Sequence, residues 1–236
     1  MDIDITPFFK RYEKLVEASD QIFKQVRQTH PDCVKCYTGC SDCCNALFDL
    51  TLIEAMYINH HFNKKYTGKE KDLFIEKCNT ADRKTYKLKK TAYKDFKSKM
   101  NETEILMKIA KARVRCPLLN DQQMCDLYEY RPITCRTYGI PTSIGGIGHT
   151  CGLSEFKEGI SYPTLNIDKL QQQLYAISND FTNSINTKHP KIKEILVPVS
   201  MAILTKYNEE FLGIAAATGT ETDKKPTKKE DYINGE

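Results

Sequence analysis

The placement of cysteine is the feature that most restricts how this chain can fold. The sequence has ten cysteines, and five of them fall between Cys33 and Cys44. The remainder, apart from the isolated Cys78, are Cys116, Cys125, Cys135 and Cys151. In a reducing compartment such density is typical of metal or redox chemistry rather than of disulfide bonds. We therefore expect two segments about 70 residues apart in the sequence to meet in the fold.

The cysteine spacing indicates a thiolate metal site. Residues 36–44 read C-x3-C-x2-C-C. Thiolates are soft ligands that select zinc or iron–sulfur clusters over magnesium or calcium, and short spacings let a loop turn several sulfurs toward one centre. Eight cysteines are the predicted metal ligands: Cys36, Cys40, Cys43, Cys44, Cys116, Cys125, Cys135 and Cys151.

Eight thiols are enough for two four-cysteine sites, which would hold one or two iron–sulfur clusters, such as 4Fe-4S, or Zn. Neighbouring side chains tend to point apart, so the adjacent pair Cys43 and Cys44 is expected to serve two centres, unless one of them bridges. Cys78 is the exception, since it stands beside Phe74 and Ala81 on an expected helix and is read as a buried, inert thiol. Cys33 either joins Cys36 as a ligand pair or is a spare thiol.

The composition is that of an ordinary soluble protein, since 28% of the 236 residues are charged. No apolar run reaches the roughly 18 residues that a membrane span needs, and the acidic start at Asp2 and Asp4 is unlike a secretory signal. We therefore expect a cytoplasmic protein with no membrane partner. Charge is uneven, because residues 64–115 hold 17 Lys or Arg against 7 Asp or Glu.

Apolar periodicity predicts a mainly α protein. Helices are expected over residues 8–28, from the capping box of Thr51 and Glu54, over 70–100, from Asn101, over 167–185, and from Pro198 through Leu212. In the helix over 70–100, Leu73, Leu88 and Phe96 are among the residues expected to face inward. Residues 116–128 are read as two short strands around a turn, and 139–148 as a glycine-rich loop. The expected fold is thus helical, with a small irregular cysteine-rich module that contains a short β-hairpin.

These elements suggest a single domain over residues 1–217. Its cysteine module is formed by 33–62 and 113–152, with a basic helical insertion at 63–112 and C-terminal helices at 163–217. Residues 218–236 are charged, lack an apolar pattern and are predicted to be a disordered tail.

The same residues resemble a known family. Residues 36–44, Arg115 to Leu119, Cys125 to Tyr128, Arg131 to Arg136, and Cys151 with Gly152 are similar to the CxxCxxCC-type cysteine-cluster proteins, which are zinc- or iron-chelating. The resemblance covers about a third of the chain. Flagellin lysine N-methylases are similar in this module, which implies a protein-lysine N-methyltransferase role that uses S-adenosylmethionine.

The sequence carries other signals beside the cysteines. The C-x3-C-x2-C spacing also occurs in radical S-adenosylmethionine enzymes, but those are barrels of alternating strands and helices, unlike this chain. Lysines interleaved with Tyr86, Tyr93 and Phe96 can bind nucleic acid, yet the helical spacing favours a solvated face whose aromatic residues point to the core. Arg131 and Arg136 are either donors beside the thiolates or ordinary surface residues, for example in an ion pair with Glu129.

The sequence therefore predicts a metal-binding protein that holds one or two iron–sulfur clusters for redox, sensing or support of a modification reaction. A zinc-stabilised, non-catalytic binding module that contacts an acidic partner is the alternative, beside the methyltransferase that the resemblance implies. The expected partner is a protein, such as a redox partner, rather than nucleic acid. No catalytic residue is assigned.

Overall fold

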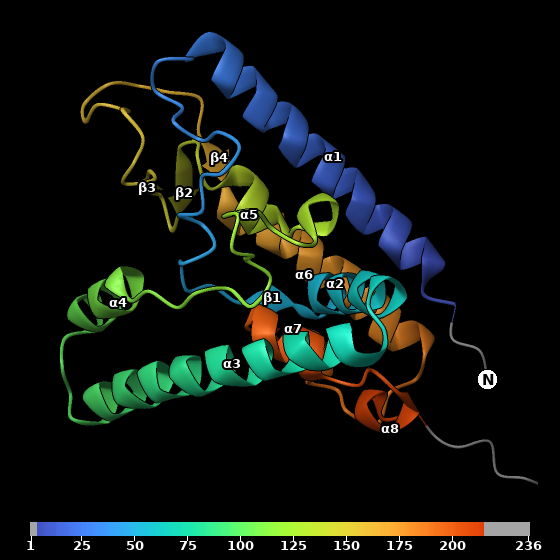
Figure 1. Cartoon of the computed structure of the whole chain (residues 1–236). Coiled ribbons are helices and arrows are strands. Elements are labelled where there is room, and N and C mark those ends of the chain that lie inside the picture. Colours follow the sequence, from blue (N-terminus) through green and yellow to red (C-terminus); the bar gives the residue numbers. More distant parts are fainter. Residues whose placement is uncertain (1–3, 215–236) are drawn as a thin grey trace, which may run out of the picture.

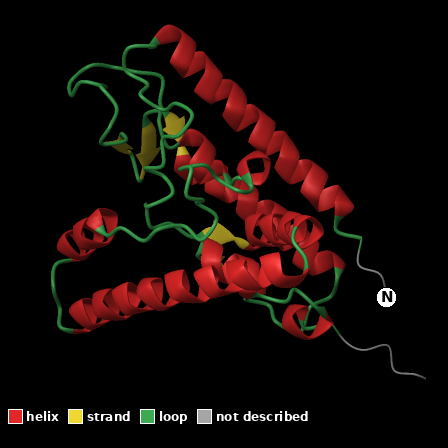
Figure 2. Ribbon diagram, viewed as in Figure 1, coloured by secondary structure: helices red, strands yellow, loops and turns green. Residues whose placement is uncertain are grey.

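Helices make up most of the computed structural model, which describes residues 4–214 (Figures 1 and 2). The helices are α1 (Thr6–Thr29), α2 (Leu52–Lys65), α3 (Gly68–Lys97), α4 (Glu102–Lys111), α5 (Ile133–Thr137), α6 (Ile167–Ser184), α7 (Val199–Leu204) and α8 (Glu209–Leu212). The mainly α prediction is confirmed. Among these helices, none is long and apolar enough to cross a membrane. The tail predicted for 218–236 lies outside the described residues.

Strands are short and form two small sheets. They are β1 (Leu50–Thr51), β2 (Thr142–Ile144), β3 (Ile147–His149), β4 (Leu165–Asn166) and β5 (Leu196–Val197). β1 pairs antiparallel with β5, while β2 lies between an antiparallel β3 and a parallel β4. Both sheets join segments that are distant in the sequence, so they fasten the irregular parts of the chain to the helices.

The core surrounds α2, whose residues from Leu52 to Asn59 are all buried. On one side α2 packs with α1 and α6, through side chains such as Tyr12 and Phe181. On the other side it packs with the start of α3 and with α7, through Phe62 and Phe74, and Leu118 and Leu127 join this second cluster. The apolar residues that flank Cys125 are therefore anchored in the main core, which fixes that part of the cysteine module.

The predicted capping box is present and does more than begin α2. The Glu54 carboxylate accepts hydrogen bonds from the Thr51 N–H at 3.1 Å and the Thr51 hydroxyl at 3.0 Å. Its other oxygen accepts the N–H of Ile133, the first residue of α5, at 3.4 Å. One buried carboxylate thus satisfies the starts of two helices, and it fixes α5, with Cys135, against α2.

The C-terminal helix expected from Pro198 is wrong in its length, because the structure divides it into α7 and α8. The Asn59 side-chain amide donates to the carbonyls of Ala202, Ile203 and Thr205 at 2.9–3.1 Å. Those carbonyls lie at the end of α7, where a helix leaves its last acceptors unsatisfied. A polar residue of α2 therefore ends α7, and this is a tertiary contact that no local pattern reveals.

The glycine-rich segment is a β-hairpin rather than a loop. β2 and β3 are joined by Gly145 and Gly146, which have φ angles of 57° and 78°. A two-residue turn with positive φ at both positions matches the twist of an antiparallel pair, and glycine adopts that conformation without strain. The two adjacent glycines were the signal for this hairpin.

The predicted burial of side chains on α3 is wrong at both ends of the helix. Leu73 is 60% exposed and Phe96 is 53% exposed, and Tyr86 and Tyr93 are also turned to solvent. The buried residues of α3 end at Thr85, since only the first part of the helix packs on α7. Beyond it, α3 projects from the body of the protein and α4 folds back beside it (Figure 1). We call residues 83–111 the α3–α4 arm.

Candidate metal centre

The two cysteine segments meet through their backbones, as the sequence predicts. The N–H of Val114 donates to the Asn45 carbonyl at 3.0 Å, and the N–H of Cys116 donates to the Cys44 carbonyl at 2.6 Å. An antiparallel bridge pairs Ala46 with Arg113. Residues 44–46 and 113–116 thus lie side by side, and the insertion of α2, α3 and α4 connects them.

Consecutive tight turns shape the first segment. Gly39 has a φ of 91°, in the left-handed region that favours glycine, and the following Cys40 N–H donates to the Tyr37 carbonyl at 3.0 Å. The N–H of Cys44 then donates to the Ser41 carbonyl at 3.0 Å, and the side-chain amide of Asn45 donates to the same oxygen at 2.9 Å. These bonds fix the backbone between Cys40 and Cys44, which directs the thiols.

The turn that presents Cys125 is organised by Asn120. Its side-chain oxygen accepts the N–H groups of Gln122 and Met124 at 3.0 and 2.9 Å, and its amide donates to Asp126 at 2.9 Å. Where two strands were expected, the structure has a single antiparallel bridge, between Leu119 and Cys125. The predicted chain reversal is correct, but the predicted strands are absent. The Asn120 side chain bonds to its own turn, and these bonds compete with the hydrogen bonds of a strand ladder.

Cys135 and Cys151 come from two further elements. Cys135 lies on α5, and its N–H donates to the Pro132 carbonyl at 3.0 Å. Cys151 follows β3, and its thiol donates to an Asp42 carboxylate oxygen at 3.6 Å. Asp42 is also within 3.6 Å of an Arg113 guanidinium nitrogen. Asp42 thus ties Cys151 to the first cysteine segment, a role that its position between Cys40 and Cys43 did not reveal.

Gly139 allows the backbone at that position to lie close to both Cys36 and α1. A β-carbon at position 139 would lie 2.7 Å from the Cys36 β-carbon and 3.3 Å from the Phe23 ring. Both distances are too short for carbon atoms in ordinary contact. The backbone at Gly139 is therefore packed directly against a predicted ligand.

All eight predicted ligands line three adjoining cavities. A cavity of about 60 Å³ is bounded by five thiols, those of Cys43, Cys44, Cys116, Cys125 and Cys135. A smaller one of about 10 Å³ is bounded by four, those of Cys36, Cys40, Cys43 and Cys151. A third, of about 40 Å³, lies against members of both sets. Cys43 lines all three, whereas Cys33 lines none of them and Cys78 is buried in the core beside Phe74.

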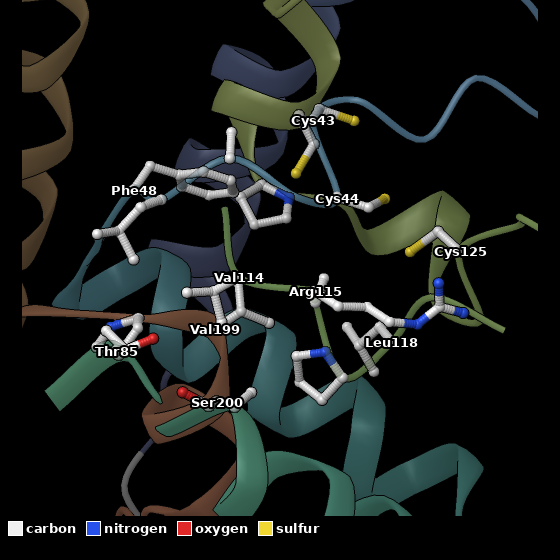
Figure 3. Close-up of a pocket in the computed structure, with 18 of the residues that line it drawn as sticks. Cys43, Cys44, Phe48, Thr85, Val114, Arg115, Leu118, Cys125, Val199 and Ser200 are labelled. Carbon is white, nitrogen blue, oxygen red and sulfur yellow. The ribbon is translucent and has the colours of Figure 1, made fainter. Parts of the chain in front are cut away.

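Cys44 and Cys125 lie on the same side of the larger cavity, with apolar side chains across from them (Figure 3). Phe48, Val114 and Val199 form much of this apolar wall, and the side chain of Arg115 extends from beside Val114 toward Cys125. We call the set Cys44, Cys116, Cys125 and Cys135 the inner group, and the set Cys36, Cys40, Cys43 and Cys151 the outer group.

Thiol electrostatics single out Cys43. Hydrogen bonds from the thiols of Cys135 and Cys44, together with the nearby Arg131 cation, lower the pKa of Cys43 to about 3. Burial raises the pKa of Cys36 to about 11 and that of Cys116 to about 12. Without metal, the group therefore contains one thiolate that accepts hydrogen bonds from protonated neighbours, and metal binding would release those protons.

The two candidate arginines differ in their surroundings. The Arg131 guanidinium stacks on the Tyr128 ring at 3.7 Å and lines two of the cavities, and its buried Nε has no hydrogen-bond partner among the described residues. Arg136 instead donates to the Asp20 carboxylate at 2.6 Å and to backbone carbonyls. Arg131 is thus the arginine beside the thiols, and Arg136 holds α5 on α1.

The thiols surround the cavities without closing on one point. Within residues 4–214, no group of three or more cysteine, histidine, aspartate or glutamate side chains is arranged to hold a metal ion. No family model, curated protein or solved structure matches the chain.

Proposed function

We propose that this protein is an iron–sulfur protein whose inner and outer groups of cysteines hold one or two clusters. The observation that carries the proposal is that all eight predicted thiols line adjoining cavities, five around the larger one and four around the smaller one, with Cys43 in both. Thiolates are the usual ligands of such clusters, and four are needed for each.

Zinc ions and iron–sulfur clusters differ in the thiol spacing that they need. Zinc draws four ligands to one point at about 2.3 Å from each sulfur. A cubane cluster instead takes one thiolate at each of four separate iron atoms, so its ligands stand farther apart. Cys43 accepts hydrogen bonds from the thiols of Cys44 and Cys135, so three sulfurs of the set lie close together, and metal and sulfide analysis separates the two kinds of centre.

Arg131 supports the same assignment. A buried N–H without an acceptor costs roughly 1–3 kcal/mol, so it is rarely left in a finished structure. Here the orphaned Nε belongs to a side chain that lines two of the thiol cavities. A thiolate or cluster sulfide is an acceptor of the appropriate charge, and such donors also tune a metal centre. The clusters would serve electron transfer, sensing or a modification reaction.

The test is metal and acid-labile sulfide analysis of the full chain purified without oxygen, with three single variants. Two four-iron clusters correspond to about eight iron atoms per chain and to broad absorbance near 400 nm. Cys116→Ser should remove the iron that the inner group holds, and Cys151→Ser the iron that the outer group holds. Cys33→Ser is the matched control, because its thiol lines none of the three cavities, and it should keep the full content.

Two results would contradict the proposal. A colourless protein with stoichiometric zinc would replace the clusters with structural zinc sites and turn the search toward a binding partner. Unchanged iron in both the Cys116 and Cys151 variants would show that the eight thiols are not the ligands.

A further inference from the structure

The outward face of the α3–α4 arm carries a stripe of cations and tyrosines. Its members recur at steps of three and four residues along α3 and all are exposed: Arg83, Tyr86, Lys87, Lys90, Tyr93, Lys94 and Lys97. At 1.5 Å per residue, the stripe is about 21 Å long. We call it the Lys/Tyr stripe. It lies on the side of α3 opposite Phe74, Cys78 and Ala81, which face the core.

The cations of the stripe have no acidic partners among the described residues. The ion pairs of this region use other lysines: Lys89 pairs with Asp49 at 2.6 Å, and Lys108 pairs with Asp95 at 3.0 Å. Within the stripe, Lys90 lies 5.7 Å from the ring centre of Tyr86, and Lys97 lies 5.4 Å from that of Tyr93. Five positive charges are therefore concentrated on one projecting helix without neutralisation from the protein.

The tyrosines distinguish between possible polyanions. Tyr86 and Tyr93 are 61% and 60% exposed, although tyrosine rings usually bury more of their apolar surface than this. Exposed aromatic rings beside unpaired cations are the features that bind unpaired bases and their phosphates. A duplex offers no free base faces, since its bases stack on one another. An anionic bilayer would favour a continuous apolar face below the lysines, and here rings and cations alternate.

We propose that the Lys/Tyr stripe binds single-stranded nucleic acid, with the cations on phosphates and the two tyrosines stacked on bases. This replaces the expectation from the sequence, which rejected nucleic acid because the aromatic residues of this helix were expected to face the core. The proposal does not rest on the metal centre, since no cysteine lies within the stripe.

The test is fluorescence anisotropy with a labelled single-stranded RNA of about 15 nucleotides and the full, metal-replete chain. With up to five phosphates contacted and a slope of about −0.7 per phosphate, affinity should fall roughly 100-fold between 50 and 200 mM salt. The triple variant Lys87→Glu/Lys90→Glu/Lys94→Glu should lose binding. Lys10→Glu/Lys14→Glu/Lys24→Glu on α1 makes the same change in net charge at exposed positions and should retain it.

Stacking is tested separately, because Tyr86→Ala and Tyr93→Ala leave the charge unchanged. Each should weaken single-strand binding about tenfold, and a duplex of the same length should bind less tightly than the single strand. Absence of RNA binding at 50 mM salt would overturn the proposal. Full affinity in both tyrosine variants, or binding to anionic vesicles in place of RNA, would overturn it as well.

Discussion

Gly139 offers a direct test of how the outer cysteine group is packed. In Gly139→Ala the new methyl group would lie 2.7 Å from the Cys36 β-carbon, and that carbon cannot rotate away because it is fixed to the backbone. Overpacking of this kind costs about 1–3 kcal/mol. The lower entropy of the unfolded alanine chain returns about 0.4–1 kcal/mol, which leaves a net loss of roughly 1–2 kcal/mol.

The assay compares thermal unfolding of the wild type, Gly139→Ala and a matched control. For a chain of this size, 1 kcal/mol lowers the midpoint by roughly 2–4 °C, so Gly139→Ala should unfold roughly 2–8 °C lower. Gly152→Ala is the control, because a β-carbon there meets nothing within 4 Å and its φ is not in the left-handed region. Its midpoint should change little. Displacement of Cys36 should also let a chelator remove the outer metal more readily from Gly139→Ala.

Equal midpoints and equal chelator resistance in the two glycine variants would refute this reasoning. They would mean that the backbone at Gly139 can withdraw from Cys36 without cost, so that the close contact does not position the thiol. Loss of stability without loss of metal would restrict the conclusion to packing.

Two further predictions concern buried polar groups. Arg131→Met keeps much of the apolar length of the side chain but removes the unpartnered donor. Metal affinity should therefore fall about 10- to 100-fold in a chelator titration, while the helical circular dichroism is unchanged. Unaltered metal affinity would show that Arg131 is not part of the metal centre. Burial raises the pKa of Glu54 above its ordinary value of 4.5, so the folded protein holds that proton more tightly than the unfolded chain does. The free energy of unfolding should then decline as pH rises from about 4.5 to the raised pKa. Chemical denaturation of Glu54→Gln should lack this decline. An identical pH profile in the variant would assign the decline to other groups.

Local patterns predicted the elements whose causes are local. The capping box of Thr51 and Glu54 marked the start of α2, and the turn expected within residues 116–128 is present. The break between α7 and α8 could not be predicted in this way, because the amide that ends α7 belongs to Asn59, more than 140 residues earlier. The exposure of Phe96 was missed for a related reason: its periodicity is helical, but the core ends before the helix does.

The sequence identified the cysteines of the candidate site, but it did not reveal how they are grouped or which other residues contact them. Soft ligands at short spacings identify the eight thiols without knowledge of the fold. Their division follows from tertiary structure, because only the fold places Cys151 near Cys36 and Cys116 near Cys44. The contribution of Asp42 likewise depends on a residue 109 positions away.

The separation of the two cysteine segments also sets an order of events on the ribosome. At roughly 5–20 residues per second, synthesis takes about 4–14 s to proceed from Cys44 to Cys116. During that interval the first five thiols have emerged without their partners, while α2 and α3 are still being made. Any centre that needs sulfurs of both segments can be completed only after Cys116 has been synthesised, so the early thiols have to remain reduced during that interval.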